Sequence, residues 1–113
     1  MHEVALCQSM IELINEQQRE LGFTSVKRVI VGLGALGHVD PHALEFAFEA
    51  SARDSVAGGA ILEIREIPGS GWCLDCSKTV EIQRRGEGCP HCGGFQLVVQ
   101  QGEELKLKEL EVM

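Results

Sequence analysis

Residues 69–94 read GSGWCLDCSKTVEIQRRGEGCPHCGG and contain two Cys-x-x-Cys pairs, Cys73 with Cys76 and Cys89 with Cys92. Two such pairs joined by a hairpin bring four sulfurs to the corners of a tetrahedron. Zn²⁺ accepts this arrangement because its filled d shell imposes no geometry of its own. The spacing therefore predicts a zinc ribbon with these four cysteines as its ligands.

The segment around the cysteines is too poor in apolar residues to fold around a core of its own. A structural Zn²⁺ contributes about 10 to 16 kcal/mol in comparable small modules, so we expect the metal to fold this part of the chain. Four thiolates leave no open position for water or substrate, which favours a structural site over a hydrolytic one. A redox Cys-x-x-Cys pair, an iron site and disulfides are the alternatives. His91, inside the second pair, could replace a cysteine as a ligand, but we expect it to be exposed.

The composition is that of a folded protein with room for one domain carrying a smaller module. The chain has 113 residues, of which 44% are hydrophobic and 24% charged, and its formal net charge is -7. An acidic chain repels phosphate backbones. Its basic clusters are small, Lys27 with Arg28 and Lys78 with Arg84 and Arg85, and we expect them to be solvated surface at a strand and at the rim of a hairpin, not a nucleic-acid-binding surface. Its start lacks a secretory signal, and no apolar run reaches the roughly 20 residues of a membrane span. We therefore expect a reducing cytoplasm and neither nucleic acid nor membrane as a partner.

The rest of the chain predicts one small sheet with two helices. Apolar residues at helical spacing indicate a helix over residues 4–22, which Gly22 ends. Asp40 and Pro41 form a good helix start, with Asp40 as the N-cap, and this second helix runs to about residue 54. Runs of β-branched and alternating apolar residues predict strands at 25–33, at 60–67 (ended by Pro68 and the GSG after it) and at 104–112.

The order of these elements predicts an α+β fold with an insertion. Residues 1–68 and 102–113 would form one domain, and residues 69–101 a zinc ribbon inserted before the last strand. That last strand changes its apolar phase near Lys108, which indicates a β-bulge or a change of the surface that covers the strand. GLGALG at residues 32–37 has the glycine spacing of a dinucleotide site, but the next helix begins too late, so we do not expect nucleotide binding.

The chain begins Met1-His2-Glu3 on a predicted helix. A glycine-bearing strand and loop follow, then the two late Cys-x-x-Cys motifs and a final strand of mixed acidic and basic residues. Together these features resemble the HypA/HybF family, the nickel metallochaperones of hydrogenase maturation, over essentially the whole chain. The resemblance implies a nickel-binding α/β domain that carries the N-terminus, and a zinc domain inserted before the last strand.

The resemblance places nickel at the N-terminus. The implied ligands are the amine of Met1, the ring and amide of His2, and the amide of Glu3. An amine, an imidazole and deprotonated backbone amides form a planar nitrogen set, which Ni²⁺ or Cu²⁺ prefers and Zn²⁺ does not require.

Asp40 has two candidate roles. It matches the position of an acidic residue that the family places near nickel, but as an N-cap its oxygens are already occupied. Capping alone and an additional contribution beside the metal therefore both stay open. His38 and His42 flank Asp40, and we expect both to be loop residues.

The function that the resemblance implies is delivery of one Ni²⁺ to the precursor of a nickel-iron hydrogenase large subunit, without catalysis. The implied partners are a GTPase of the same maturation pathway and, in some organisms, urease maturation proteins. We expect a monomer or a weak homodimer. One alternative is a zinc-ribbon adaptor that binds a protein or nucleic-acid partner, and another is a thiol oxidoreductase that uses one Cys-x-x-Cys pair.

Overall fold

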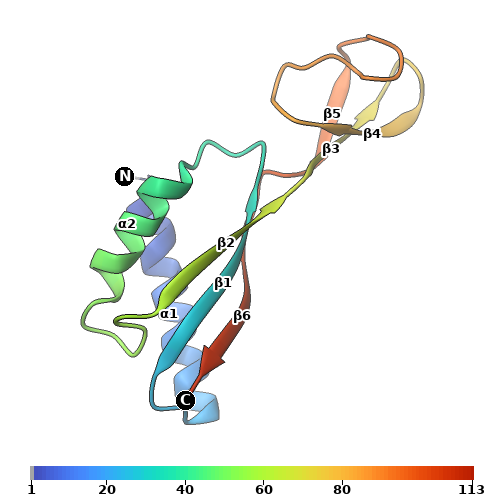
Figure 1. The fold of residues 1–113 in the computed structure, drawn as a ribbon. Coiled ribbons are helices and arrows are strands. Elements are labelled where there is room, and N and C mark those ends of the chain that lie inside the picture. Colours follow the sequence, from blue (N-terminus) through green and yellow to red (C-terminus); the bar gives the residue numbers. More distant parts are fainter. Residues whose placement is uncertain (1) are drawn as a thin grey trace. The chain divides into compact units, whose positions relative to one another are not determined.

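The computed structural model describes residues 2–113, with side chains from Glu3 onward, and these residues form two compact units (Figure 1). The first unit comprises the chain up to Val31 together with Val39–Arg65 and Lys106–Met113, and the second comprises Gly32–His38 and Glu66–Leu105. The elements are α1 (His2–Leu21), β1 (Val26–Gly34), α2 (Pro41–Ala52), β2 (Ile61–Ile67), β3 (Gly69–Cys73), β4 (Lys78–Ile82), β5 (Leu97–Gln101) and β6 (Leu105–Val112). Two helices with small sheets confirm the predicted α+β class. Neither helix is long and apolar enough to cross a membrane.

The three predicted strands outside the cysteine-rich segment form one sheet in the order β2-β1-β6. β6 runs antiparallel to β1: Gly34 N donates to Glu104 O near one end, and Met113 N donates to Ser25 O at the other. β1 and β2 run in the same direction and are connected through α2 (Figure 1). A parallel pair needs such a crossover, which a helix supplies.

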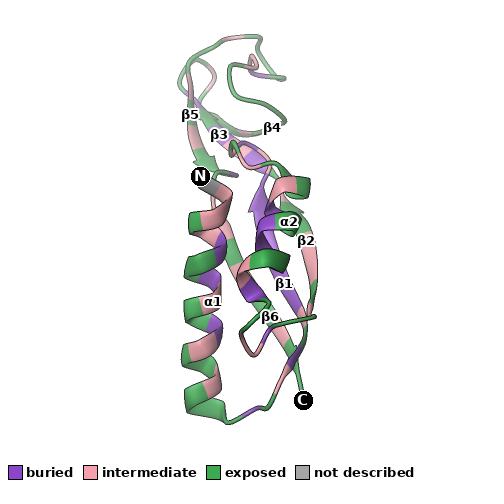
Figure 2. Ribbon diagram, turned by 90° about the vertical axis from the view of Figure 1, so that its left-hand side faces the viewer, coloured by how far each residue is buried: buried purple, intermediate pink, exposed green. Residues whose placement is uncertain are grey.

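The core of the first unit lies where α1 and α2 pack together and against β1. On α1 the buried side chains Cys7, Met10 and Ile14 are three and four residues apart, so they form one stripe along the helix. Both faces of β1 are largely buried, as expected of a central strand (Figure 2). Leu13 and Leu21 share the apolar spacing of α1 but are 47% and 71% exposed, so the apolar surface of this helix is wider than its buried stripe.

The end of α1 and the start of α2 are those that the sequence predicts, whereas α1 already begins at His2 and α2 ends at Ala52, before the predicted end near residue 54. Gly22 adopts a φ of 74° and donates its N–H to Gln18 O, which closes α1 after Leu21. Asp40 has extended backbone angles and caps α2, with Pro41 in the first turn.

The second unit contains the sheet β4-β3-β5, in which β3 is central and antiparallel to both neighbours. β2 ends at Ile67, before Pro68, as predicted, but the GSG after Pro68 does not interrupt the extended chain, because β3 begins at Gly69. A Cβ at Gly69 would lie 2.6 Å from both Ile82 O and Leu36 Cγ. Glycine therefore stands here to let the neighbouring segments approach, and it does not mark the end of the extended chain.

The GLGALG segment uses its backbone amides within the second unit. Gly34 N donates to Glu104 O, Ala35 N to Ile67 O and Leu36 N to Gly102 O, over 2.7–2.9 Å. A phosphate cradle needs these N–H groups free to point at an anion. These three amides are therefore committed to neighbouring segments of the chain and are not free to bind an anion.

Candidate metal centres

The four cysteines of the two Cys-x-x-Cys pairs converge on one point of the second unit. Their sulfur atoms all lie within 4.8 Å of one another. Cys73 Sγ is 3.6 Å from Cys92 Sγ, and Cys76 Sγ is 3.8 Å from Cys89 Sγ. Zn–S bonds of about 2.3 Å in a tetrahedron place neighbouring sulfurs about 3.8 Å apart, whereas a disulfide needs about 2.05 Å. The cluster has the dimensions of a Zn(Cys)₄ site.

Each pair forms the same type of turn. Ser77 N donates to Cys73 O and Gly93 N donates to Cys89 O, both over 2.8 Å. Ser77 and Gly93 each follow the second cysteine of their pair, and both have positive φ, 54° and 77°. This repeated turn folds each chain segment around its two sulfurs, and it explains the glycine after the second pair.

Backbone N–H groups favour a thiolate within this cluster. Hydrogen bonds to the sulfur of Cys89, foremost from the amide of Cys92 and also from that of His91, lower the pKa of the Cys89 thiol to about 7. At Cys76 burial is the main effect and raises the pKa. A bound Zn²⁺ supplies the positive charge that deprotonates all four thiols, so the donor set fits this cation.

His91 stands outside the cysteine cluster. Its Nε2 lies 2.9 Å from Lys78 Nζ, and the side chains are exposed. Because an ammonium group has only donors, His91 Nε2 accepts this hydrogen bond. The contact agrees with the expectation of an exposed His91, and the sulfur set is complete without it.

The fifth cysteine, Cys7, belongs to the core of the first unit. Its side chain is fully buried on α1, and Sγ lies 3.6 Å from Leu44 O of α2. Burial, with a smaller effect from the charge of Glu3, raises the pKa of the Cys7 thiol to about 11. A neutral thiol of this kind packs as a small apolar side chain.

The predicted nickel ligands lie at the start of α1. Met1 and the side chain of His2 lie outside the described residues. Glu3 is half-buried in the first turn of α1. This turn lies beside α2, because Glu3 and Val4 share an apolar groove with Phe46 and other residues of α2. From Glu3 onward, the four clustered cysteines are the only group of three or more ligand side chains close enough to share one ion.

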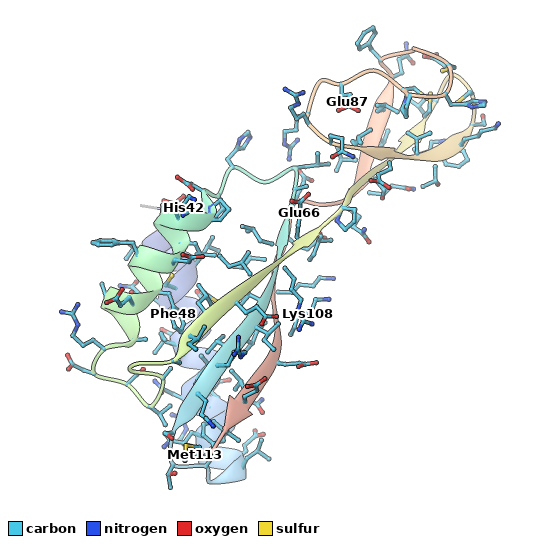
Figure 3. All side chains as sticks on the ribbon, in the orientation of Figure 1. His42, Phe48, Glu66, Glu87, Lys108 and Met113 are labelled. Carbon is cyan, nitrogen blue, oxygen red and sulfur yellow. The ribbon has the colours of Figure 1, made fainter. Side chains whose placement is uncertain are left out.

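The acidic and histidine side chains near α2 do not converge with one another into a metal site. Asp40 Oδ1 accepts a hydrogen bond of 3.0 Å from His42 N, which confirms the predicted N-cap. His38 and His42 are exposed, and His42 belongs to the first turn of α2 and not to a loop (Figure 3). A second Asp40 oxygen stays available for another donor or cation.

The capping role of Asp40 predicts that two replacements of this residue differ in their effect on stability. Asp40→Ala removes the acceptor of the His42 N–H, so we expect the free energy of unfolding of the first unit to fall by about 1 kcal/mol. Asp40→Asn keeps a capping oxygen and should change stability by much less. Urea titration of both variants measures the difference, and equal losses would contradict the capping role.

Arg85 has a structural role that the sequence does not indicate. The expectation that it is solvated at the rim of a hairpin is wrong, because its Nε donates to Leu36 O over 3.0 Å and its guanidinium forms an ion pair with Glu103. Both partners are distant in sequence and within the second unit. Local spacing cannot predict these contacts, because they form only when the folded chain brings the segments of Leu36, Arg85 and Glu103 together.

The family model described as "Hydrogenase/urease nickel incorporation, metallochaperone, hypA" matches residues 1–112 of this chain. Among curated proteins, a hydrogenase maturation factor HypA of Rhodopseudomonas palustris (strain TIE-1) is 54% identical over 112 residues. Hydrogenase maturation factor HypA 2 of Bradyrhizobium diazoefficiens is 53% identical over the same length. In both comparisons 99% of each chain is covered.

Two solved structures share the fold. The solution structure of the Ni metallochaperone HypA from Helicobacter pylori is 28% identical, with a TM-score of 0.72, and the match covers 98% of this chain and 97% of that one. A second solution structure of a HypA protein is 30% identical, with a TM-score of 0.74 and coverage of 100% and 97%.

Proposed function

This chain belongs to the HypA family of hydrogenase and urease nickel-incorporation proteins, and on that premise we propose that it binds one Ni²⁺ and delivers it for hydrogenase maturation. The observation that carries the proposal is the family match along nearly the whole chain, including its start Met1-His2-Glu3. A metal carrier binds and releases its ion without changing a substrate chemically, so the proposed function requires no catalytic group. The adaptor alternative is not favoured, because it does not account for this match.

We propose the N-terminus as the nickel site, with the Met1 amine, the His2 ring and amide, and the Glu3 amide as ligands. The first N–H groups of a helix have no partner within the helix, so the amides of His2 and Glu3 are not committed to hydrogen bonds inside α1. Once deprotonated, such amides complete the planar nitrogen set that Ni²⁺ prefers. Asp40 is proposed as an additional acidic group beside this site, through the carboxylate oxygen that the cap leaves free.

We propose a structural role for zinc in the ribbon of residues 69–101, held by Cys73, Cys76, Cys89 and Cys92. A closed set of four sulfurs suits an ion that stays in place, in contrast to the nickel cargo. The thiols must stay reduced to bind it, which supports the cytoplasm as the place of action. The proposed recipient of nickel is a hydrogenase large-subunit precursor, with a maturation GTPase as a further partner and urease maturation proteins where urease is present.

Nickel titration across pH tests the proposed site. The reference pKa of an N-terminal amine is about 7.7 to 8.0, and nickel must displace the protons of the amine and of the amides. We therefore expect one Ni²⁺ per zinc-loaded chain at pH 8, and an affinity that falls at least about tenfold per pH unit below the pKa of the amine. Calorimetry with a native N-terminus measures this, and an affinity that is constant between pH 8 and pH 6 would contradict an amine ligand.

A further inference from the structure

β6 is an edge strand of the sheet β2-β1-β6, and an apolar groove runs along it. The groove measures about 440 Å³, and α1 forms its other wall. Three of its side chains are largely exposed: Leu13 and Leu21 of α1, and Val112 of β6, which is 43% exposed. An edge strand with free backbone groups beside exposed apolar side chains is a template for pairing with another strand.

The middle of β6 contains a change of phase. Glu104 O accepts from β1 at one end, and Met113 N donates to β1 at the other. In a regular antiparallel strand, the residues that bond one neighbour are an even number of positions apart, but these two residues are nine apart. Leu107 and Leu110 are both half-buried, whereas Lys108 and Glu109 between them are exposed. The change of phase therefore lies at Lys108–Glu109, where the sequence indicates it. The β1 partners Gly34 and Ser25 are also nine residues apart, so β6 has no extra residue relative to β1.

Because of this change of phase, apolar residues supply the backbone groups that point away from β1 in both halves of β6. Backbone groups that point away from β1 come from Leu105 and Leu107 in the first half, and from Leu110 and Val112 in the second. Leu107, Leu110 and Val112 line the groove beside α1, and Lys108 and Glu109 lie at its edge. Leu105 shares the phase of Leu107. Two copies of the strand can then meet with matching apolar faces.

The sequence of β6 is LKLKELEV. When one copy is aligned antiparallel to a second, each lysine can face a glutamate and each apolar residue can face an apolar residue. A two-fold axis between Lys108 and Glu109 places Lys108 opposite Glu109 of a second copy, and Lys106 opposite its Glu111. The same axis places Leu107 opposite the second copy's Leu110, and Leu105 opposite its Val112. Neither lysine makes an ion pair within residues 3–113, and Lys108 projects freely from β6 (Figure 3).

We propose that β6 is the dimerisation strand of this protein, and that it pairs antiparallel with β6 of a second copy. Two β2-β1-β6 sheets would join into one of six strands, with four cross-strand Lys–Glu pairs. Because the axis is perpendicular to the sheet, the two α1 helices would lie on the same face. Leu13 and Leu21 would then be covered by the second copy. The partner is a second copy because an unrelated strand has no reason to match this charge order.

Charge-reversed strands test the pairing. The acidic-strand variant carries Lys106→Glu and Lys108→Glu, and the basic-strand variant carries Glu109→Lys and Glu111→Lys. In a self-pair of either variant every cross-strand pair is repulsive, so we expect dimerisation at least roughly tenfold weaker than in the parent chain. In an equimolar mixture, all four pairs are attractive again, and a heterodimer should form with at least the affinity of the parent.

Sedimentation velocity of the zinc-loaded full chain over a range of concentrations and salt measures these dimers. The matched control is Glu45→Lys with Glu49→Lys on α2, which has the same charge change as the basic-strand variant, does not line the β6 groove, and should dimerise like the parent. A parent chain that stays monomeric at millimolar concentration would overturn the proposal. Variants that dimerise like the parent, or a mixture without heterodimer, would overturn it equally.

Discussion

Replacing Cys89 with serine is expected to abolish zinc binding and to unfold the sheet β4-β3-β5. Cys89 is buried and supplies one of four sulfurs that lie within 4.8 Å of one another. Few apolar side chains support this sheet, and Trp72, Phe95 and Val98 near the cluster are themselves exposed. Structural zinc contributes about 10 to 16 kcal/mol in small modules, which exceeds what so small a core can replace.

Metal analysis and hydrogen exchange measure this result separately for each unit. We expect zinc to fall from about one ion per chain to background, and the amides of β3 and β4 to lose protection, while those of β1 around Val29 stay protected. Cys7→Ala is the matched control, because Cys7 is equally buried but lies in the other unit. A Cys89→Ser chain that retains zinc and full protection would contradict the zinc assignment.

Replacing His2 with alanine is expected to weaken nickel binding by at least about 100-fold. Changing a residue that only contacts a metal ligand typically costs 10- to 100-fold, and a lost imidazole ligand costs more. The zinc content should stay at one ion per chain, because the two sites are made of different donor types. Calorimetric titration of the zinc-loaded variant with Ni²⁺ measures the affinity.

His42→Ala is the matched control for His2→Ala. His42 is an exposed histidine in the first turn of α2, beside the capping residue Asp40. If nickel is bound at the N-terminus, loss of this ring should change the affinity by less than about tenfold. An equal loss from both replacements would point to a nickel site at the start of α2.

Local chemistry made a large part of this structure predictable. The cysteine spacing predicted a cluster whose sulfurs do meet, since each Cys-x-x-Cys turn closes on its own backbone at Ser77 and Gly93. The cap at Asp40 and the stop at Gly22 depend on hydrogen bonds within a few residues. The strands β1, β2 and β6 carry enough β-branched or alternating residues to be recognised without their neighbours.

The remainder depends on contacts between distant segments. β3 was missed because Gly69 reads as a breaker, although the close approach of Ile82 and Leu36 is what requires glycine there. The contacts of Arg85 cannot be predicted, because nothing near it in sequence shows that Leu36 and Glu103 lie within its reach. The exposure of Leu13 and Leu21 likewise could not be inferred from helical spacing, which indicates only which residues share a face.

Acetylating the amine of Met1 tests the nickel site most directly. The acetyl group leaves every side chain in place and converts the amine into an amide, so the planar set loses the nitrogen donor that anchors it. Calorimetry should find one Ni²⁺ bound by the zinc-loaded chain with a free amine at Met1, and binding at least about 100-fold weaker by the acetylated chain. Equal nickel affinity in the two chains would contradict a site built on the N-terminal amine.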